Sequence, residues 1–580
     1  MKIKFLIILF LLFSIILGAQ TVHDPNNEIY KDIDTWLVRG YVKEFPPMTR
    51  PYPIKLINKI LEQVIDNGDE KAFELAQKYL DVLAPGARAV HPGLKTYVHG
   101  NYDDYGIVVS PFVEGLFYIR DLLSVNYNFA FHGDTDKYNP DINRFGGEQY
   151  DVPGTYSPYP DLQNDRADVG PFRVIQNWTS LIALGSSDIY FQAGLSRSSY
   201  GPFYDNGVVV GPQAPRAGHF SFIFWDPKYS YEILFQSIVA TDYYYEEWFH
   251  SKYNVVHTLN FRPIQNIEFG VIQCLTFGER IDLLYLVPFS YLFGSQTING
   301  FNDNAYIGLN FRWRPVNTLL VNTQVYVDDF SVNGILKGKP YVKAAGEIGV
   351  SWSPARSILS KLDLDYTAVM PYTFSHWVIP SNMHYNGHPG NDQTKKPFGI
   401  EGTPVANYYD YTHRGRNLGP DLEPNSDRVS LRSTWKIFRN LDINLSAYLI
   451  RHANASADKP VFDPNYHDGT IFDSGGTDPW YTDKGPQPSK TTIQNYYEDE
   501  TAFLTQSVIE TKLGGTIGVT WSIPTSFGIF KLMGGYGIQY GWNRSRNLNI
   551  RITNVNIRSE INKDNNGFDQ FWNIGMMWSW

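Results

Sequence analysis

Large apolar side chains occupy every second position at the end of the chain, in the sequence NIGMMWSW. Counting back from the end by twos gives one set of residues: Trp580, Trp578, Met576, Ile574 and Trp572. The positions between them form a second set: Ser579, Met577, Gly575, Asn573 and Phe571. A period of two belongs to a strand and not to a helix. One apolar face opposite a mixed face is typical of a sheet between hydrocarbon and a polar interior.

From Thr96 onward, strand-like segments alternate with turns. Four stretches have the pattern of hairpins, each with a turn near the residues in parentheses: 254–279 (Pro263, Asn266), 304–330 (Pro315, Asn317), 428–452 (Arg439, Asn440) and 514–542 (Pro524, Ser526). Each hairpin has two segments of about ten residues, the length of a tilted membrane strand, whereas a soluble sandwich favours shorter strands.

Long stretches rich in Gly, Pro, Asn and Asp separate the hairpins, at 133–171, 376–427 and 453–500. Connections of this length are uncommon in compact domains but usual as the external loops of outer-membrane barrels. Dividing residues 93–580 by a repeat of roughly 27 residues gives about 18 antiparallel strands. We therefore expect an all-β transmembrane barrel over 93–580, with a lumen filled by inward side chains or loops.

Residues 20–92 carry the helical patterns of the chain. A first helix is predicted before Gly40, a second from Pro53 to the Asn67-Gly68 pair, and a third capped by Asp69 and ended by Pro85. Their expected buried faces are Ile29, Ile33, Trp36 and Leu37; Leu56, Ile57, Ile60, Leu61 and Val64; and Phe73, Ala76, Tyr79, Leu80 and Leu83. These faces predict a small helical bundle on the periplasmic side, packed on itself or on the barrel mouth.

Residues 1–19 predict a cleaved secretory signal peptide. Lys2 and Lys4 precede an apolar run from Phe5 to Ile16, and the small residues Gly18 and Ala19 follow. That run is shorter than the roughly 20 residues of a spanning helix. No later stretch has 18 consecutive apolar residues, which leaves a soluble secreted protein or a β-barrel open.

Composition narrows the classes of partner. The chain has 49 basic and 59 acidic residues, a net charge of -10 that argues against nucleic acid. Its single cysteine, Cys274, has no partner for an internal disulfide. The 36 Phe, 40 Tyr and 14 Trp residues would supply two interfacial girdles in contact with outer-membrane lipid.

No pattern in the sequence predicts catalytic residues, a cofactor or a metal site, and we expect no enzyme. The segment Gly194–Ser198 lacks the second glycine of a nucleophile elbow. His384 and His388 are four residues apart, but the glycine and proline around them exclude the helix that a zinc pair at this spacing needs.

Clusters of aromatic and acidic residues offer flat faces for sugar rings and carboxylates for sugar hydroxyls. The candidate polysaccharide-binding residues are Tyr243, Tyr244, Tyr245, Trp248, Trp480, Tyr481, Tyr496 and Tyr497. The alternative is that they belong to the interfacial girdle or to ordinary loop packing.

Several motifs, in this order, resemble the Wzi-like capsule-assembly outer-membrane proteins over nearly the whole mature chain: RGYVKEFPPMTRPYP (39–53), QAGLSRSSYGPF (192–203), FGERIDLLYLVPF (277–289), TQVYVDDF (323–330) and YTHRGRNLGPDLEPNSDR (411–428). The resemblance implies an 18-stranded barrel with a periplasmic helical bundle in the outer membrane of a diderm bacterium. It also implies a lectin that holds capsular or other exopolysaccharide at the cell surface, with no catalytic residues.

The C-terminal pattern of Asn573, Gly575, Trp578 and Trp580 resembles the signal by which the barrel-assembly machinery recognises a last strand. One alternative function stays open: a porin-like channel for small polar solutes or sugars, because a barrel of about 18 strands can enclose an aqueous lumen.

Overall fold

The computed structural model describes residues 24–580 except for 85–89, 102–104, 120–122, 136–165, 205, 242–247, 279, 300–302, 331–341, 375–408, 414–415, 439, 455–502, 527, 549–557, 562 and 580. The predicted signal peptide, residues 1–19, lies outside the described residues.

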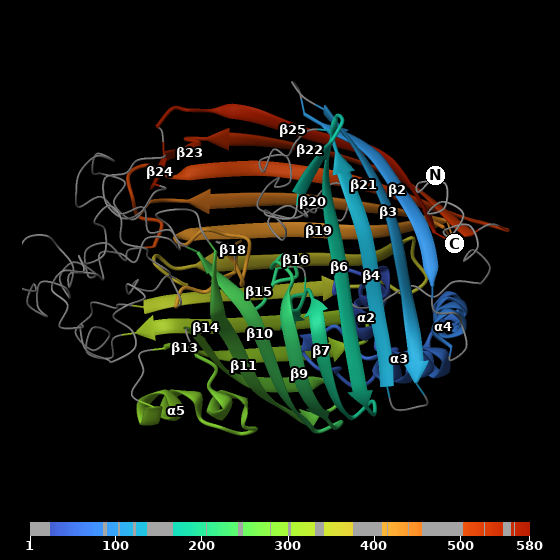
Figure 1. Cartoon of the computed structure of the whole chain (residues 1–580), viewed down its shortest axis with the longest axis horizontal. Helices are drawn as coiled ribbons and strands as arrows, with labels where there is room; N and C mark the ends of the chain where they lie inside the picture. The colour runs from blue at the N-terminus through green and yellow to red at the C-terminus, as the bar shows by residue number, and fades with distance from the viewer. Residues whose placement is uncertain are drawn as a thin grey trace, which may run out of the picture.

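Eighteen antiparallel strands close into a barrel among the described residues (Figure 1), which confirms the predicted fold class. They are β2 (His91–Gly100), β3 (Tyr105–Ile119), β4 (Leu123–Asp134), β6 (Phe172–Gly185), β7 (Ile189–Ser196), β9 (Ala217–Trp225), β10 (Tyr229–Thr241), β11 (Trp248–Ile264), β12 (Ile267–Gly278), β13 (Asn304–Val316), β14 (Leu319–Phe330), β15 (Val342–Trp352), β16 (Leu359–Val369), β19 (Ser426–Phe438), β20 (Leu441–His452), β21 (Glu510–Thr525), β22 (Gly528–Trp542) and β25 (Gly567–Ser579). A short strand, β5 (Arg166–Val169), extends the sheet beside β6.

Side chains alternate across the barrel wall, with the larger apolar ones outside. In β9, the inward positions are buried and include His219 and Ser221, whereas the intervening phenylalanines, Phe220, Phe222 and Phe224, face outward. The same alternation buries Glu232 and Glu268 inside and leaves large apolar side chains of most other strands exposed. This distribution inverts that of a soluble protein and matches a wall with hydrocarbon outside.

The barrel closes between its first and last strands. β2 pairs with β25 in an antiparallel register from Gly93 opposite Ser579 to Gly100 opposite Trp572. Along β25, Ile574 is 68% exposed and Met576 is 48% exposed, whereas Asn573 is buried. The two faces predicted for the C-terminal segment are therefore confirmed at these positions.

The four predicted hairpins are confirmed as β11–β12, β13–β14, β19–β20 and β21–β22, with turns that include Asn266, Asn317, Asn440 and Ser526. The strands exceed the expected ten residues and reach 17 in β11. These short turns lie at one end of the barrel. The opposite end carries the long connections, among them the one from β7 to β9 and the one from β12 to β13.

In the described part of the chain, three helices precede the barrel: α2 (Glu28–Val38), α3 (Ile54–Asn67) and α4 (Glu70–Leu83). α2 ends before Gly40, whose φ of 74° lies in the left-handed region that glycine adopts without strain. Asp69 caps α4, because its carboxylate accepts a hydrogen bond from the backbone N–H of Ala72. The prediction that Phe73 is buried is wrong: it is 44% exposed, because the face of α4 that packs inward carries Ala72, Ala76 and Leu83 instead.

The helices close the end of the barrel that carries the short turns (Figure 1). Lys59 of α3 pairs with Asp188 in the β6–β7 turn at 2.8 Å. The indole N–H of Trp225, at the end of β9, donates to the carbonyl of Phe45 at 3.0 Å. Within the described part of the chain, no helix has the length and hydrophobicity of a membrane span.

Candidate functional site

Most of the sequence-predicted sugar-binding residues lie outside the described residues: Tyr243, Tyr244, Tyr245, Trp480, Tyr481, Tyr496 and Tyr497. Trp248 is the first residue of β11, and its backbone pairs with Thr241 at the end of the barrel with the long connections. Of the C-terminal pattern, Asn573, Gly575 and Trp578 lie in β25, and Trp580 is outside the described residues.

Three segments fold into the lumen, and we call them together the plug: residues 45–53, 197–216 and 409–425. Every described residue of the first two segments is buried, as are most of those in the third. Loops of the chain therefore enter the lumen, which agrees with the expectation that inward side chains or loops occupy it. However, the expectation that 376–427 is an external connection is wrong for its described part, 409–425, because that part lies inside the barrel.

The plug segments are joined to one another by backbone hydrogen bonds. β1 (Thr49–Arg50) pairs with β8 (Ser199–Tyr200), which links segment 45–53 to segment 197–216. The N–H of Gly211 donates to the carbonyl of Leu418 at 2.8 Å and so links segment 197–216 to segment 409–425. Buried backbone groups need such partners, and these bonds make the three segments one unit.

Charged side chains of the barrel wall hold segment 45–53. The carboxylate of Glu232, on β10, accepts hydrogen bonds from two successive backbone N–H groups of the segment, at 3.0 and 2.9 Å. Arg312, on β13, donates to the carbonyl of Pro46 at 2.8 Å and pairs with Glu268 at 2.5 Å. Buried charges need an opposite charge or hydrogen bonds: Arg312 has the charge of Glu268, and Glu232 has the hydrogen bonds of the segment.

A second charged contact holds segment 409–425. The ammonium of Lys252, on β11, pairs with Asp410, and neither side chain is exposed to solvent. The same ammonium donates to the carbonyl of Thr412 at 2.9 Å. Thr412 belongs to β17 (Thr412–His413), which forms a short antiparallel pair with β18 (Arg416–Asn417).

An aromatic cluster surrounds the same segment. The ring of Tyr411 lies 5.0 Å from that of Tyr306 and 5.4 Å from that of Phe374, measured between centroids. Its hydroxyl donates to the carbonyl of Val209 at 2.7 Å. All three rings are buried, so they fix the plug to the wall and offer no face to a sugar.

Arg50 connects the helices to the plug. Its guanidinium pairs with Asp34 of α2 and lies 3.3 Å from the centroid of the Tyr204 ring. Burial is the largest single effect and lowers the pKa of Arg50, but the attraction and hydrogen bond of Asp34, together with Tyr52 and Tyr204, outweigh burial and hold that pKa above its ordinary value. The guanidinium therefore stays charged and keeps its cation–π contact with Tyr204.

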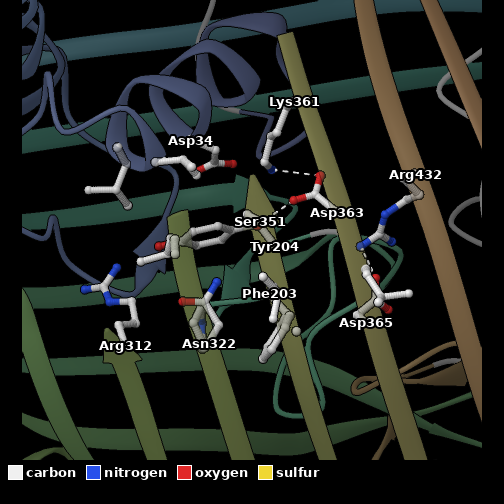
Figure 2. A pocket seen from close by; sticks show the side chains of 17 residues that line it. Asp34, Phe203, Tyr204, Arg312, Asn322, Ser351, Lys361, Asp363, Asp365 and Arg432 are labelled. Atoms are coloured by element: carbon white, nitrogen blue, oxygen red, sulfur yellow. Dashed lines mark hydrogen bonds and ion pairs between the residues drawn. The ribbon is translucent and has the colours of Figure 1, made fainter. Parts of the chain in front are cut away.

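A cavity of about 50 Å³ lies between α2, the plug and the wall (Figure 2). Four of its charged lining side chains pair with one another, Lys361 with Asp363 at 3.1 Å and Arg432 with Asp365 at 2.8 Å. A water molecule needs about 10–15 Å³ of such space, whereas ligand pockets measure roughly 300–1,000 Å³. The cavity has room for a few waters and is too small for a sugar ring.

Among the described residues, three histidines on the lumen side, which the sequence did not suggest as a site, each contact a serine hydroxyl. Their hydroxyl–imidazole distances are 2.6, 2.7 and 2.9 Å, in the pairs Ser110–His132, Ser198–His219 and Ser426–His452. Each serine is only 1% exposed, so no substrate reaches its hydroxyl in this arrangement. Within the described ranges, no group of three or more His, Cys, Asp or Glu side chains is arranged to hold a metal ion.

No protein-family profile matches the chain, and no curated protein sequence does. Among solved structures, the chain is similar to Wzi, an outer-membrane protein involved in group 1 capsule assembly in Escherichia coli and described as a carbohydrate-binding β-barrel. The two chains are 12% identical with a TM-score of 0.51, over 96% of this chain and 99% of Wzi.

Two Pseudomonas aeruginosa barrels are also similar. OccD3 gives a TM-score of 0.40 at 8% identity, over 85% of this chain and 91% of its own. OccK2, solved in complex with glucuronate, gives 0.38 at 7% identity, over 85% of this chain and 95% of its own. The TM-scores of these two matches are too low to support an inference about this chain. The likeness to Wzi, at 12% identity, shows the fold alone. The chain has the fold of an 18-stranded outer-membrane β-barrel with N-terminal helices.

Proposed function

We propose that this protein is a non-enzymatic outer-membrane lectin that attaches or organises capsular or other surface polysaccharide. The observation that carries the proposal is the plug: three buried segments, tied to one another and to the wall, occupy part of the lumen through which a channel would pass solutes. With the plug in the lumen, recognition falls to the end of the barrel with the long connections.

The likeness to Wzi supports the same reading, because that barrel is described as carbohydrate-binding. The porin-like alternative requires an aqueous path through the lumen. Such a path would have to pass the buried contacts at Glu232, Arg312 and Lys252, which hold the plug to the wall.

The proposed orientation places the short turns and helices in the periplasm and the long connections at the cell surface. Outer-membrane barrels have short periplasmic turns and longer extracellular loops. In this arrangement, residues 1–19 are a cleaved signal peptide, 20–92 form the periplasmic helical segment and 93–580 form the barrel. Asn573, Gly575, Trp578 and Trp580 are the signal for the barrel-assembly machinery.

Binding is assigned to the aromatic side chains Tyr243, Tyr244, Tyr245, Trp248, Trp480, Tyr481, Tyr496 and Tyr497. Each aromatic face offers a weak contact to one sugar of a repeating polymer. Several such contacts along one chain give an avidity well above the affinity of any single contact.

The test is binding of the purified full-length protein to surface polysaccharide from the same cells, measured by surface plasmon resonance. Replacing Trp480 and Tyr481 together with alanine should weaken binding, and deletion of 453–500 should weaken it further while the barrel stays folded. A matched control is Phe73→Ala, which removes an exposed aromatic ring at the opposite end of the barrel.

Equal binding by the wild type, the double variant and the deletion variant would reject the assignment to 453–500. No binding by the wild-type protein would reject the lectin function itself. Stable ion conductance by the wild type in planar bilayers would favour the channel instead.

A further inference from the structure

Residues 280–299, between β12 and β13, turn back over the outer face of the barrel, and we call them the strap. They contain the 3-10 helix η3 (Leu283–Leu286) and the helix α5 (Leu292–Asn299). Figure 1 shows α5 outside the ring of strands. The strap begins at the end of the barrel that carries the long connections, where a loop would be expected to extend into water.

The strand register shows which face the strap covers. Ile233, His257, Gln273 and Ile307 lie opposite one another on four neighbouring strands, so their side chains share one face of the wall. Ile307 is exposed outside the barrel, which places the whole row on the outer face. Ile233 and its neighbours Val255 and Leu275 are nevertheless buried, because they pack in one cluster with residues of the strap.

The strap supplies hydrogen bonds to polar groups of this outer face. The backbone N–H of Phe289 donates to the hydroxyl of Tyr231 at 2.6 Å, and Tyr231 donates to Nδ1 of His257 at 2.9 Å. Nε2–H of His257 then donates to the carbonyl of Tyr285 at 2.9 Å. The N–H of Leu292 donates to the side chain of Gln273 at 3.0 Å. Without the strap, Nε2–H of His257 and the side chain of Gln273 would face hydrocarbon without these partners, which is costly.

The outer surface of the strap is apolar. Its exposed large side chains are Ile281, Leu283, Val287, Phe289, Tyr291 and Ile298, of which Leu283 is 71% exposed and Ile298 is 81% exposed. From Leu283 to Asn299 the sequence has no charged residue. Arg280, at the start of the strap, pairs with Asp303, which directly precedes β13.

This apolar surface is continuous with the bare wall beside it. Phe269 and Val271 on β12 and Leu309 on β13 are exposed on the same outer face of the barrel. An aqueous loop does not normally expose so many large apolar side chains within 20 residues. We propose that the strap is embedded in the outer leaflet of the membrane, where its apolar surface replaces the covered wall as the contact with lipid hydrocarbon.

This inference rests on the proposed membrane location of the barrel, and the experiment separates the two. Single cysteines at Leu283 and Ile298 are labelled with an environment-sensitive fluorophore in the full-length protein, because native Cys274 is buried. Phe269→Cys serves as the wall control and Lys228→Cys, in the β9–β10 turn, as the aqueous control. The proteins are reconstituted into phosphatidylcholine vesicles whose acyl chains carry a doxyl quencher.

We expect Leu283→Cys and Ile298→Cys to be quenched by the lipid as strongly as Phe269→Cys and to resist aqueous iodide. Quenching by iodide alone at both strap positions, with Phe269→Cys quenched by lipid, overturns the strap proposal and leaves the membrane location intact. Protection of both strap positions from both quenchers, together with a disulfide-linked dimer of unlabelled Leu283→Cys, overturns the strap proposal. In that case a second copy of the protein covers the strap. Absence of lipid quenching at Phe269→Cys contradicts the membrane location itself.

Discussion

Replacing Lys252 with methionine removes the positive charge that faces Asp410 and keeps a side chain of similar length. Both side chains are wholly buried, Lys252 on the wall and Asp410 on segment 409–425 of the plug. Two unit charges about 3 Å apart attract by about 5 kcal/mol at an effective dielectric constant of about 20. Removing one partner of a buried pair costs about 3–5 kcal/mol, because the other charge stays desolvated.

That energy is lost from the contact between the plug and the wall, because the barrel strands keep their own hydrogen bonds. A cost of about 3–5 kcal/mol raises the population of a displaced plug by roughly a hundred- to several-thousand-fold. We therefore expect Lys252→Met to show intermittent ion-conducting openings in planar bilayers, where the wild type is silent.

Two further variants control this experiment. Lys252→Met combined with Asp410→Leu should return the protein to silence, because an apolar pair of similar size is tolerated where a lone charge is not. Lys361→Met, which removes a wall lysine paired with Asp363 on its own strand, should also be silent. If Lys252→Met is folded, as judged by heat-modifiable migration on gels, and still silent, the ion pair does not hold the plug.

Three further predictions concern stability, each measured by urea unfolding in detergent micelles. Leu309→Arg lies midway along β13 on the exposed face and should lower the free energy of unfolding by about 2–4 kcal/mol. An unchanged free energy of unfolding would contradict the placement of Leu309 against lipid. Tyr204→Leu should cost about 0.5–2 kcal/mol through loss of the ring over Arg50, and no loss would show that this contact is not stabilising. Trp36→Ala, in the core of the helices, should lower the free energy of unfolding by about 3–5 kcal/mol. Phe73→Ala should change it by less than about 0.5 kcal/mol. Equal effects of the two variants would contradict the described packing of α4.

The strands and helices could be predicted because their signals are local. Alternation with a period of two identified the hairpins, and turn residues such as Asn317 marked their ends. Asp69 and Gly40 marked helix ends through capping and a left-handed backbone. Phe73 was misplaced because a broad apolar stripe does not show which of its edges meets the core.

The plug and the strap could not be predicted in the same way, because their positions depend on contacts distant in sequence. Segment 409–425 has the glycine, proline and asparagine of a surface loop, yet Lys252 and Tyr306 hold it in the lumen. The strap has an apolar sequence with no clear period, and its place follows from bonds to Tyr231 and His257 on other strands. Of the candidate sugar-binding residues, only the backbone position of Trp248 can be compared with the structure.

The measurement that tests the central claim most directly is polysaccharide retention on living cells. Cell-bound and shed polymer are compared in a deletion strain, in that strain with the wild-type gene restored, and in that strain with the Trp480→Ala, Tyr481→Ala double variant. We predict that the deletion strain makes the polymer but sheds it, that the wild type restores retention, and that the double variant restores it only in part. Full retention in the deletion strain would contradict the account.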